Sequence, residues 1–265
     1  MFKTNIFEKN GDHDIVDQKG IFSVLEYERD ISVSPEMASE AYFASQMNVR
    51  KKQLLATLNE SPGVIAQAGE MQMMIGKLKV ETDIKGPGDL VKKFVGSKVT
   101  GESTVKPHYT GSGVVAMEPT FKYIILQDLA EWNFGMVIED GMFLACEDTV
   151  SMHVVARSNV SSAVLGNEGL FNNVLEGIGV VALESSVPKA ELIVIEIEND
   201  EVKIDGNMAI AWSKDLEFTV ERTTPTLIGS MVAGEGLVNV YRGTGKILVA
   251  PVANNKGIST PKTKP

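Results

Sequence analysis

Three stretches of the sequence decide the fold: TGESTVKPHYTGSGVVAMEP at residues 100–119, NEGLFNNVLEGIGVVALES at residues 167–185 and GEGLVNVYRGTGKILVAP at residues 234–251. Each stretch contains a glutamate, a strand-like run, a Gly-x-Gly pair and a second apolar run. The glutamates Glu102, Glu168 and Glu235 are 66 and 67 residues apart. Because self-similarity at a fixed period marks a duplicated supersecondary unit, the sequence predicts three internal β repeats.

The Gly-x-Gly pairs predict tight turns between short strands. Glycine reaches the positive φ that a hairpin or a bulge needs, so each stretch is expected to form two strands joined by a turn. The pairs are Gly111 and Gly113, Gly177 and Gly179, and Gly243 and Gly245.

Two of the glycine pairs also satisfy the loose dinucleotide-binding pattern Gly-x-Gly-x-x-Ala, as GSGVVA at residues 111–116 and GIGVVA at residues 177–182. That chemistry needs a strand, a glycine turn and then a helix whose N-terminus faces the pyrophosphate. Here the following residues are β-branched and short, and the pattern recurs in phase with the repeat. We therefore expect strand–turn–strand structure and no nucleotide site.

The repeats divide the chain into an N-terminal extension (residues 1–48), a three-repeat β domain (residues 49–252) and a polar tail (residues 253–265). In the extension, residues 20–29 favour a strand, and Ser34-Pro35 favours the start of a short helix that reaches about Gln46. The three units of the β domain are expected at approximately residues 49–119, 120–185 and 186–252.

Two segments of the β domain are less regular. Residues 49–59 fit a helix or a strand, and the alternation of Leu54, Ala56 and Leu58 favours the strand. Residues 89–95 carry one apolar face at helical spacing and predict a short helix.

Charge and composition limit the class of protein. The net charge is −10 and the pI about 4.9, so the surface repels phosphate backbones and a nucleic-acid partner is disfavoured. The single cysteine, Cys146, excludes an intramolecular disulfide and lies in an apolar run, as a buried hydrophobe does. No uncharged apolar run approaches the ~18 residues of a membrane span, and the N-terminus lacks a targeting signal. These features predict a cytoplasmic protein.

Several phrases together resemble the family named for altered inheritance of mitochondria, protein 24. They are AQAGEMQMM, KVTGESTVKPHYTGSG, IEDGMFLAC, VSSAVLGNEGL, DGNMAIAWS and GEGLVNVYRGTG, and the resemblance covers roughly residues 49–252. It implies three β-sandwich units around a pseudo-threefold axis, similar to the subunit of the tryptophan-sensing RNA-binding attenuation protein (a TRAP-like fold). It also implies a bacterial member, and it supplies no catalytic residues.

The candidate site residues are the three repeated glutamates. Glu102, Glu168 and Glu235 are expected either to form a ring of carboxylates that binds a cation or a basic partner, or to cap turns by accepting backbone N–H bonds. No catalytic, cofactor or metal site is predicted, because no nucleophile–base set appears and the three histidines share no ligand spacing.

The sequence favours a non-enzymatic scaffold or assembly protein. The alternative is a module that binds a small molecule or single-stranded RNA, and it rests on fold analogy alone. Short-stranded units are expected to leave sheet edges exposed, so the sequence also predicts a homo-oligomer, a trimer or a multiple of one. No other protein partner can be named.

Overall fold

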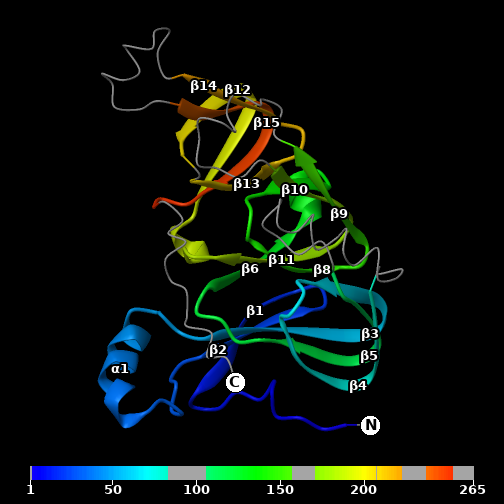
Figure 1. Ribbon diagram of the computed structural model, residues 1–265, viewed down its shortest axis with the longest axis vertical. Coiled ribbons are helices and arrows are strands. Elements are labelled where there is room, and N and C mark those ends of the chain that lie inside the picture. The colour runs from blue at the N-terminus through cyan, green and yellow to red at the C-terminus, as the bar shows by residue number, and fades with distance from the viewer. Residues whose placement is uncertain (1, 83–105, 157–170, 207, 223–236, 253–265) are drawn as a thin grey trace, which may run out of the picture.

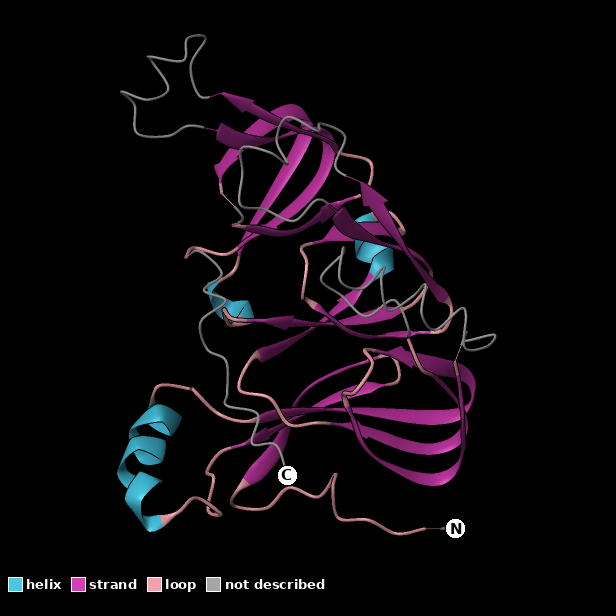
Figure 2. Ribbon diagram, viewed as in Figure 1, coloured by secondary structure: helices cyan, strands magenta, loops and turns pink. Residues whose placement is uncertain are grey.

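The computed structural model of the chain describes residues 2–82, 106–156, 171–206, 208–222 and 237–252. Those residues are mostly strands, with one α-helix and three short 3-10 helices among them. The strands form two sheets, of eight and of seven strands (Figures 1 and 2). The mainly β fold class predicted from the sequence is therefore confirmed.

The first sheet is a nearly closed barrel. Its strands are β1 (His13–Lys19), β2 (Phe22–Tyr27), β3 (Lys52–Ala66), β4 (Met71–Glu81), β5 (His108–Met117), β6 (Tyr123–Asp128), β8 (Phe143–Glu147) and β11 (Val180–Ser185). The order is β1-β2-β3-β8-β11-β6, and β5 pairs with both β3 and β4. The sheet curves until its outer strands β1 and β6 are in contact.

The second sheet is a half-barrel in the upper part of Figure 1. Its strands are β7 (Gly135–Ile138), β9 (Val150–Ala156), β10 (Phe171–Gly177), β12 (Ile193–Asp205), β13 (Ala209–Ser213), β14 (Glu217–Arg222) and β15 (Leu237–Val249). The order is β12-β15-β13-β7-β10-β9, and β14 also pairs with β15.

The N-terminal extension contains one more strand than the sequence indicated. The hairpin of β1 and β2 joins the barrel because β2 pairs with β3 along Lys52 to Ala56. The expected helix is present, as a 3-10 turn η1 (Pro35–Met37) that leads into α1 (Ala38–Gln46), with Pro35 at its first position. Residues 89–95, expected to be helical, lie outside the described residues.

The glycine pairs do not form hairpin turns, so that prediction was wrong. β5 runs without interruption through Gly111 and Gly113, and β15 runs through Gly243 and Gly245. In the middle stretch, β10 ends at Gly177 and β11 starts at Val180, and the two strands belong to different sheets. No helix follows any of these glycine pairs in the described residues.

Each glycine pair instead faces an irregularity in the neighbouring strand. The register of β3 shifts opposite the first pair and that of β12 opposite the third, while η2 (Leu129–Trp132) interrupts β6 and β7 opposite the second. A non-glycine residue with φ between 51° and 69° lies at every one of these places. The facing residues are Glu60 with Gly111, Phe134 with Gly177, and Asn199 with Thr244.

Glycine is required where two backbones approach closely. A Cβ at Gly111 would lie 2.2 Å from the carbonyl oxygen of Lys77, and a Cβ at Gly177 would lie 2.5 Å from that of Thr149. Both glycines also have a φ above 100°. The pattern therefore marks sites of close strand contact, and the sequence detected the glycine requirement but assigned it to a turn.

Three large apolar clusters and a small one of Leu25, Leu55 and Ala116 hold the sheets together. One fills the barrel and includes Phe22, Leu54 and Tyr109, and a second lies between the sheets and includes Trp132 and Phe143. The third packs on the half-barrel. It contains the aromatic group of Trp212, Phe218 and Tyr241, whose ring centroids are 5.2 to 5.6 Å apart.

The stretch expected to be the middle unit is shared between the two sheets. β6, β8 and β11 belong to the barrel, whereas β7, β9 and β10 belong to the half-barrel. Within this stretch the chain crosses between the sheets at η2, between β7 and β8, at the turn after β8 and at Gly177–Gly179. The two sheets therefore share one continuous core rather than forming separate domains.

Candidate functional site

The three predicted site residues cannot be placed. Glu102, Glu168 and Glu235 all fall in segments outside the described residues (83–105, 157–170 and 223–236). Each segment connects two antiparallel neighbours: β4 with β5, β9 with β10, and β14 with β15. The turn-cap and binding-ring roles of these glutamates both stay predictions.

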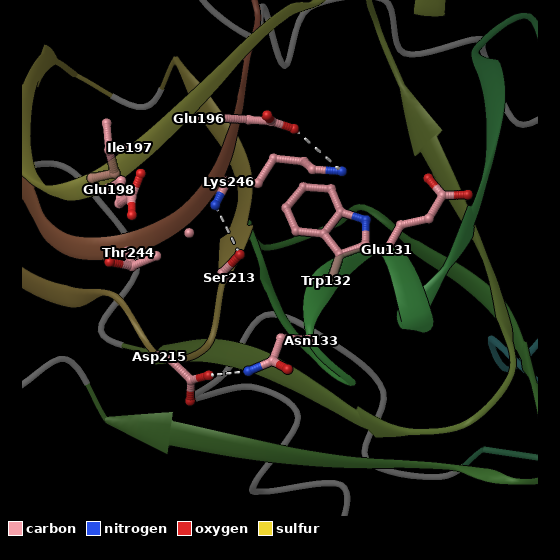
Figure 3. Close-up of a pocket in the computed structure, with 11 residues that line it drawn as sticks. Glu131, Trp132, Asn133, Glu196, Ile197, Glu198, Ser213, Asp215, Thr244 and Lys246 are labelled. Atoms are coloured by element: carbon pink, nitrogen blue, oxygen red, sulfur yellow. Dashed lines mark hydrogen bonds and ion pairs between the residues drawn. The ribbon is translucent and has the colours of Figure 1, made fainter.

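An open cavity of about 520 Å³ lies where η2 meets the face of the half-barrel (Figure 3). One side consists of Glu131 and Trp132 in η2 and of Asn133, which follows it. The other side comes from the irregular part of β12, from the turn between β13 and β14, and from the third glycine pair in β15. Gly245 has no room for a side chain, because a Cβ there would lie 2.8 Å from the Cβ of Ser213.

The indole of Trp132 forms the apolar part of the cavity wall. It is almost fully buried, and its Nε1–H donates to Oε1 of Gln127 at 3.0 Å. The ammonium of Lys246 lies 5.1 Å from the ring centroid, within the range of a cation–π contact. The same ammonium is 4.0 Å from Oε1 of Glu196, so the lysine lies between an aromatic face and a carboxylate.

The rest of the rim is acidic. Glu131 forms an ion pair with Lys19 at 2.6 Å, and Asp215 accepts a hydrogen bond from Asn133 at 2.9 Å. Glu198 has no side-chain partner among the described residues. Including Glu196, the rim has four carboxylates and one ammonium, so a positively charged group would be attracted to it.

The protonation of the rim does not indicate acid–base chemistry. The hydrogen bond from Lys19 lowers the pKa of Glu131, so this carboxyl is ionised at neutral pH. A general acid needs the opposite shift, which burial in an apolar pocket provides. The cavity can hold a small cation by its charge and its indole face.

Sequence reasoning missed this cavity because its residues come from four separate segments. Its only local signal was Asp128, which precedes the 3-10 helix and caps it by accepting from the Ala130 N–H at 2.9 Å. An Asp before an apolar run is common, and it does not reveal the strands that face it.

Glu147 is a second, buried carboxylate, and its role is structural. Oε1 accepts from the Ile21 N–H at 3.1 Å, and Oε2 accepts from the Val180 N–H at 3.0 Å. The side chain thereby ties the β1–β2 turn to the start of β11. A Cβ at Gly20 would lie 2.3 Å from Oε1, which explains the glycine in that turn.

The histidine and cysteine side chains form no metal centre. Nε2 of His108 is 2.9 Å from Oδ2 of Asp148, and no group of three metal-ligating side chains occurs in the described part of the chain. Cys146 is fully buried, as the sequence indicated, and burial raises the pKa of its thiol to about 12. The thiol is therefore protonated and behaves as a small hydrophobe.

Comparison with known protein families shows to which family the chain belongs. A family model described as Mitochondrial biogenesis AIM24 matches residues 45–252, which is most of the chain. The protein belongs to this family. The membership confirms the resemblance found in the sequence, and the matched range starts within α1, so most of the N-terminal extension lies outside the AIM24 region.

Two relatives of this AIM24 family member come from Streptococcus pyogenes. An uncharacterised protein of serotype M6 is 29% identical over 202 residues, which cover 72% of this chain and 78% of the relative. A protein with a crystal structure is 25% identical, and the alignment covers 78% of this chain and 90% of that one, with a TM-score of 0.57. Neither has a described activity. No helix in the described residues of this chain is long and apolar enough to cross a membrane.

Proposed function

We propose that the protein is a non-enzymatic scaffold of the cytosol that works as a homo-oligomer, a trimer or a multiple of one. The observation that carries this proposal is the presence of long free sheet edges. Among the described residues, β4 has eleven residues and pairs only with β5, and β12 has thirteen residues and pairs only with β15. A free edge presents unpaired N–H and C=O groups, which proteins cover, charge or pair with another chain.

The strand arrangement supports the proposal that the chain is built from three repeats around a pseudo-threefold axis. Three antiparallel pairs, β4 with β5, β9 with β10 and β14 with β15, each flank one of the repeated glutamate segments. Each glycine pair faces an irregularity in an earlier segment, which is a register shift in β3 or β12 or the helix η2 between β6 and β7. A TRAP-like unit with this organisation would present similar edges at several places on its surface.

Light scattering on the purified full chain tests the oligomer. We expect a mass that is a multiple of 28.7 kDa and holds across a hundredfold dilution. A mass that stays at the single-chain value even at the concentrated end would overturn the proposal. The test needs no substitution, so a failure of folding cannot imitate the negative result.

The cavity favours a second function, binding of a small cationic molecule. Its four carboxylates repel RNA phosphates, so of the two binding alternatives it supports the small molecule rather than the single-stranded RNA. Titration with spermidine should change the fluorescence of Trp132, and the Glu198→Gln variant should bind more weakly. The Trp132→Phe variant is the control, since its remaining tryptophan, Trp212, does not line the cavity. An unchanged spectrum up to millimolar spermidine would eliminate this candidate.

A further inference from the structure

The two longest free edges carry opposite charge. β4 contains Lys77, Lys79 and a single carboxylate, whereas β12 contains five carboxylates and a single lysine. Lys77 and Lys79 have exposed side chains and no ion-pair partner in the described part of the chain. The edges also lie in different parts of the molecule, β4 at the lower right of Figure 1 and β12 in the upper half. They cannot neutralise each other within one chain.

The spacing of the charges matches between the two edges. Lys77 and Lys79 are two residues apart and share one face of β4, and Glu196 and Glu198 do the same in β12. In an antiparallel pair, Lys77 opposite Glu198 places Lys79 opposite Glu196. Directly opposed charges of unlike sign stabilise a strand pair. Glu196 remains available because its side chain is 74% exposed despite its contact with Lys246.

The same register aligns apolar side chains on the other face. It places Leu78 opposite Ile197 and Val80 opposite Ile195. Within its own chain, Leu78 packs against the cluster inside the barrel, and both isoleucines pack against the aromatic cluster of the half-barrel. Pairing would therefore join the apolar face of one sheet to that of the next. A shift by one residue would place lysines on the apolar face, so one register is selected.

We propose that β4 of one copy pairs antiparallel with β12 of the next copy, with Lys77 opposite Glu198 and Lys79 opposite Glu196. The inference rests on the proposed self-assembly and specifies its interface. Because the two edges differ, the contact is head-to-tail. It builds a ring where the rotation between copies closes, as in the expected trimer, and a filament where it does not.

Charge reversal tests this interface on the full chain. The variants Lys77→Glu/Lys79→Glu and Glu196→Lys/Glu198→Lys each place like charges at every contact, and we expect association to weaken about tenfold or more. The quadruple variant swaps both edges and restores opposite charges. It should assemble at nearly the wild-type concentration. The matched control for the second variant is Glu36→Lys/Glu40→Lys, which makes the same change of net charge as Glu196→Lys/Glu198→Lys on the exposed surface of η1 and α1.

The possible outcomes distinguish a failure of the proposed β4–β12 interface from a failure of the proposed self-assembly. A wild-type chain that is monomeric by light scattering overturns both proposals. A wild-type oligomer whose mass is unchanged in the two double variants overturns the β4–β12 contact alone. The same holds if the quadruple variant stays dissociated while its circular dichroism is native. Loss of assembly in both double variants, recovery in the quadruple variant and no effect of the control establish the contact.

Discussion

Replacing Gly111 with alanine should cost much more stability than the same change at Gly69. Both glycines have positive φ, 111° and 87°, so both variants pay for the backbone conformation, roughly 1–3 kcal/mol. At Gly69 nothing lies within 4 Å of the new methyl group, whereas at Gly111 the methyl would lie 2.2 Å from the Lys77 carbonyl oxygen. An ordinary contact needs more than an extra ångström, so β4 and β5 must separate, which adds about 1–3 kcal/mol.

Urea unfolding of the wild-type protein and of the Gly111→Ala and Gly69→Ala variants measures the difference in stability. Trp132 and Trp212 are both buried, so their fluorescence reports on unfolding. With equal m-values, the free energy of unfolding should be lower for Gly111→Ala than for Gly69→Ala by roughly 1–3 kcal/mol. Gly11→Ala should be nearly neutral, because its methyl meets only the far end of Arg29 at 4.0 Å. Equal losses for the Gly111 and Gly69 variants would refute the argument that close strand contact requires glycine.

Three further predictions follow from the buried and paired side chains. Glu147→Ala should lower the free energy of unfolding by roughly 2–4 kcal/mol, since two backbone N–H groups lose their acceptor; an unchanged urea midpoint would contradict this. Cys146 should resist thiol reagents at about pH 8 until urea is added, because its pKa is raised to about 12 by burial; rapid labelling of the native protein would show otherwise. The lowered pKa of Glu131 means that its ion pair with Lys19 stabilises the fold above about pH 4.5 and is lost as the pH falls through the lower folded value. Glu131→Gln should therefore flatten the acid side of the stability curve, and an unaltered slope would count against the pair.

Local sequence patterns predicted that the chain is mainly β, but they did not predict which strands pair with one another. Alternation of Leu54, Ala56 and Leu58 correctly indicated a strand, and Pro35 correctly marked a helix start. β1 was missed because its residues HDIVDQK have little apolar alternation. It is held by its hairpin partner β2 and by Glu147, which accepts a hydrogen bond from the turn that follows β1. The second contact joins residues 126 positions apart, so the local sequence does not reveal it.

The error at the glycine pairs has a physical origin. A positive φ is most often needed at a turn, so the sequence alone assigned Gly111 and Gly177 to turns. The structural reason is a carbonyl oxygen of another segment, which belongs to Lys77 in β4 or to Thr149 in the turn before β9. This contact cannot be inferred from neighbours in the chain. The cavity escaped prediction for the same reason: Trp132 and Lys246 are 114 residues apart and meet only in the folded chain.

The division of the middle stretch between the sheets limits how this architecture can change in evolution. A solenoid gains or loses units easily because each repeat contacts only its neighbours. Here the deletion of residues 120–185 would remove β8 and β11 from the barrel and β7 and β10 from the half-barrel at once. Insertion of a further stretch with the same division would have to rebuild both sheets. We therefore expect relatives to vary in their N-terminal extensions and in the segments between paired strands, while the strands of residues 120–185 are retained.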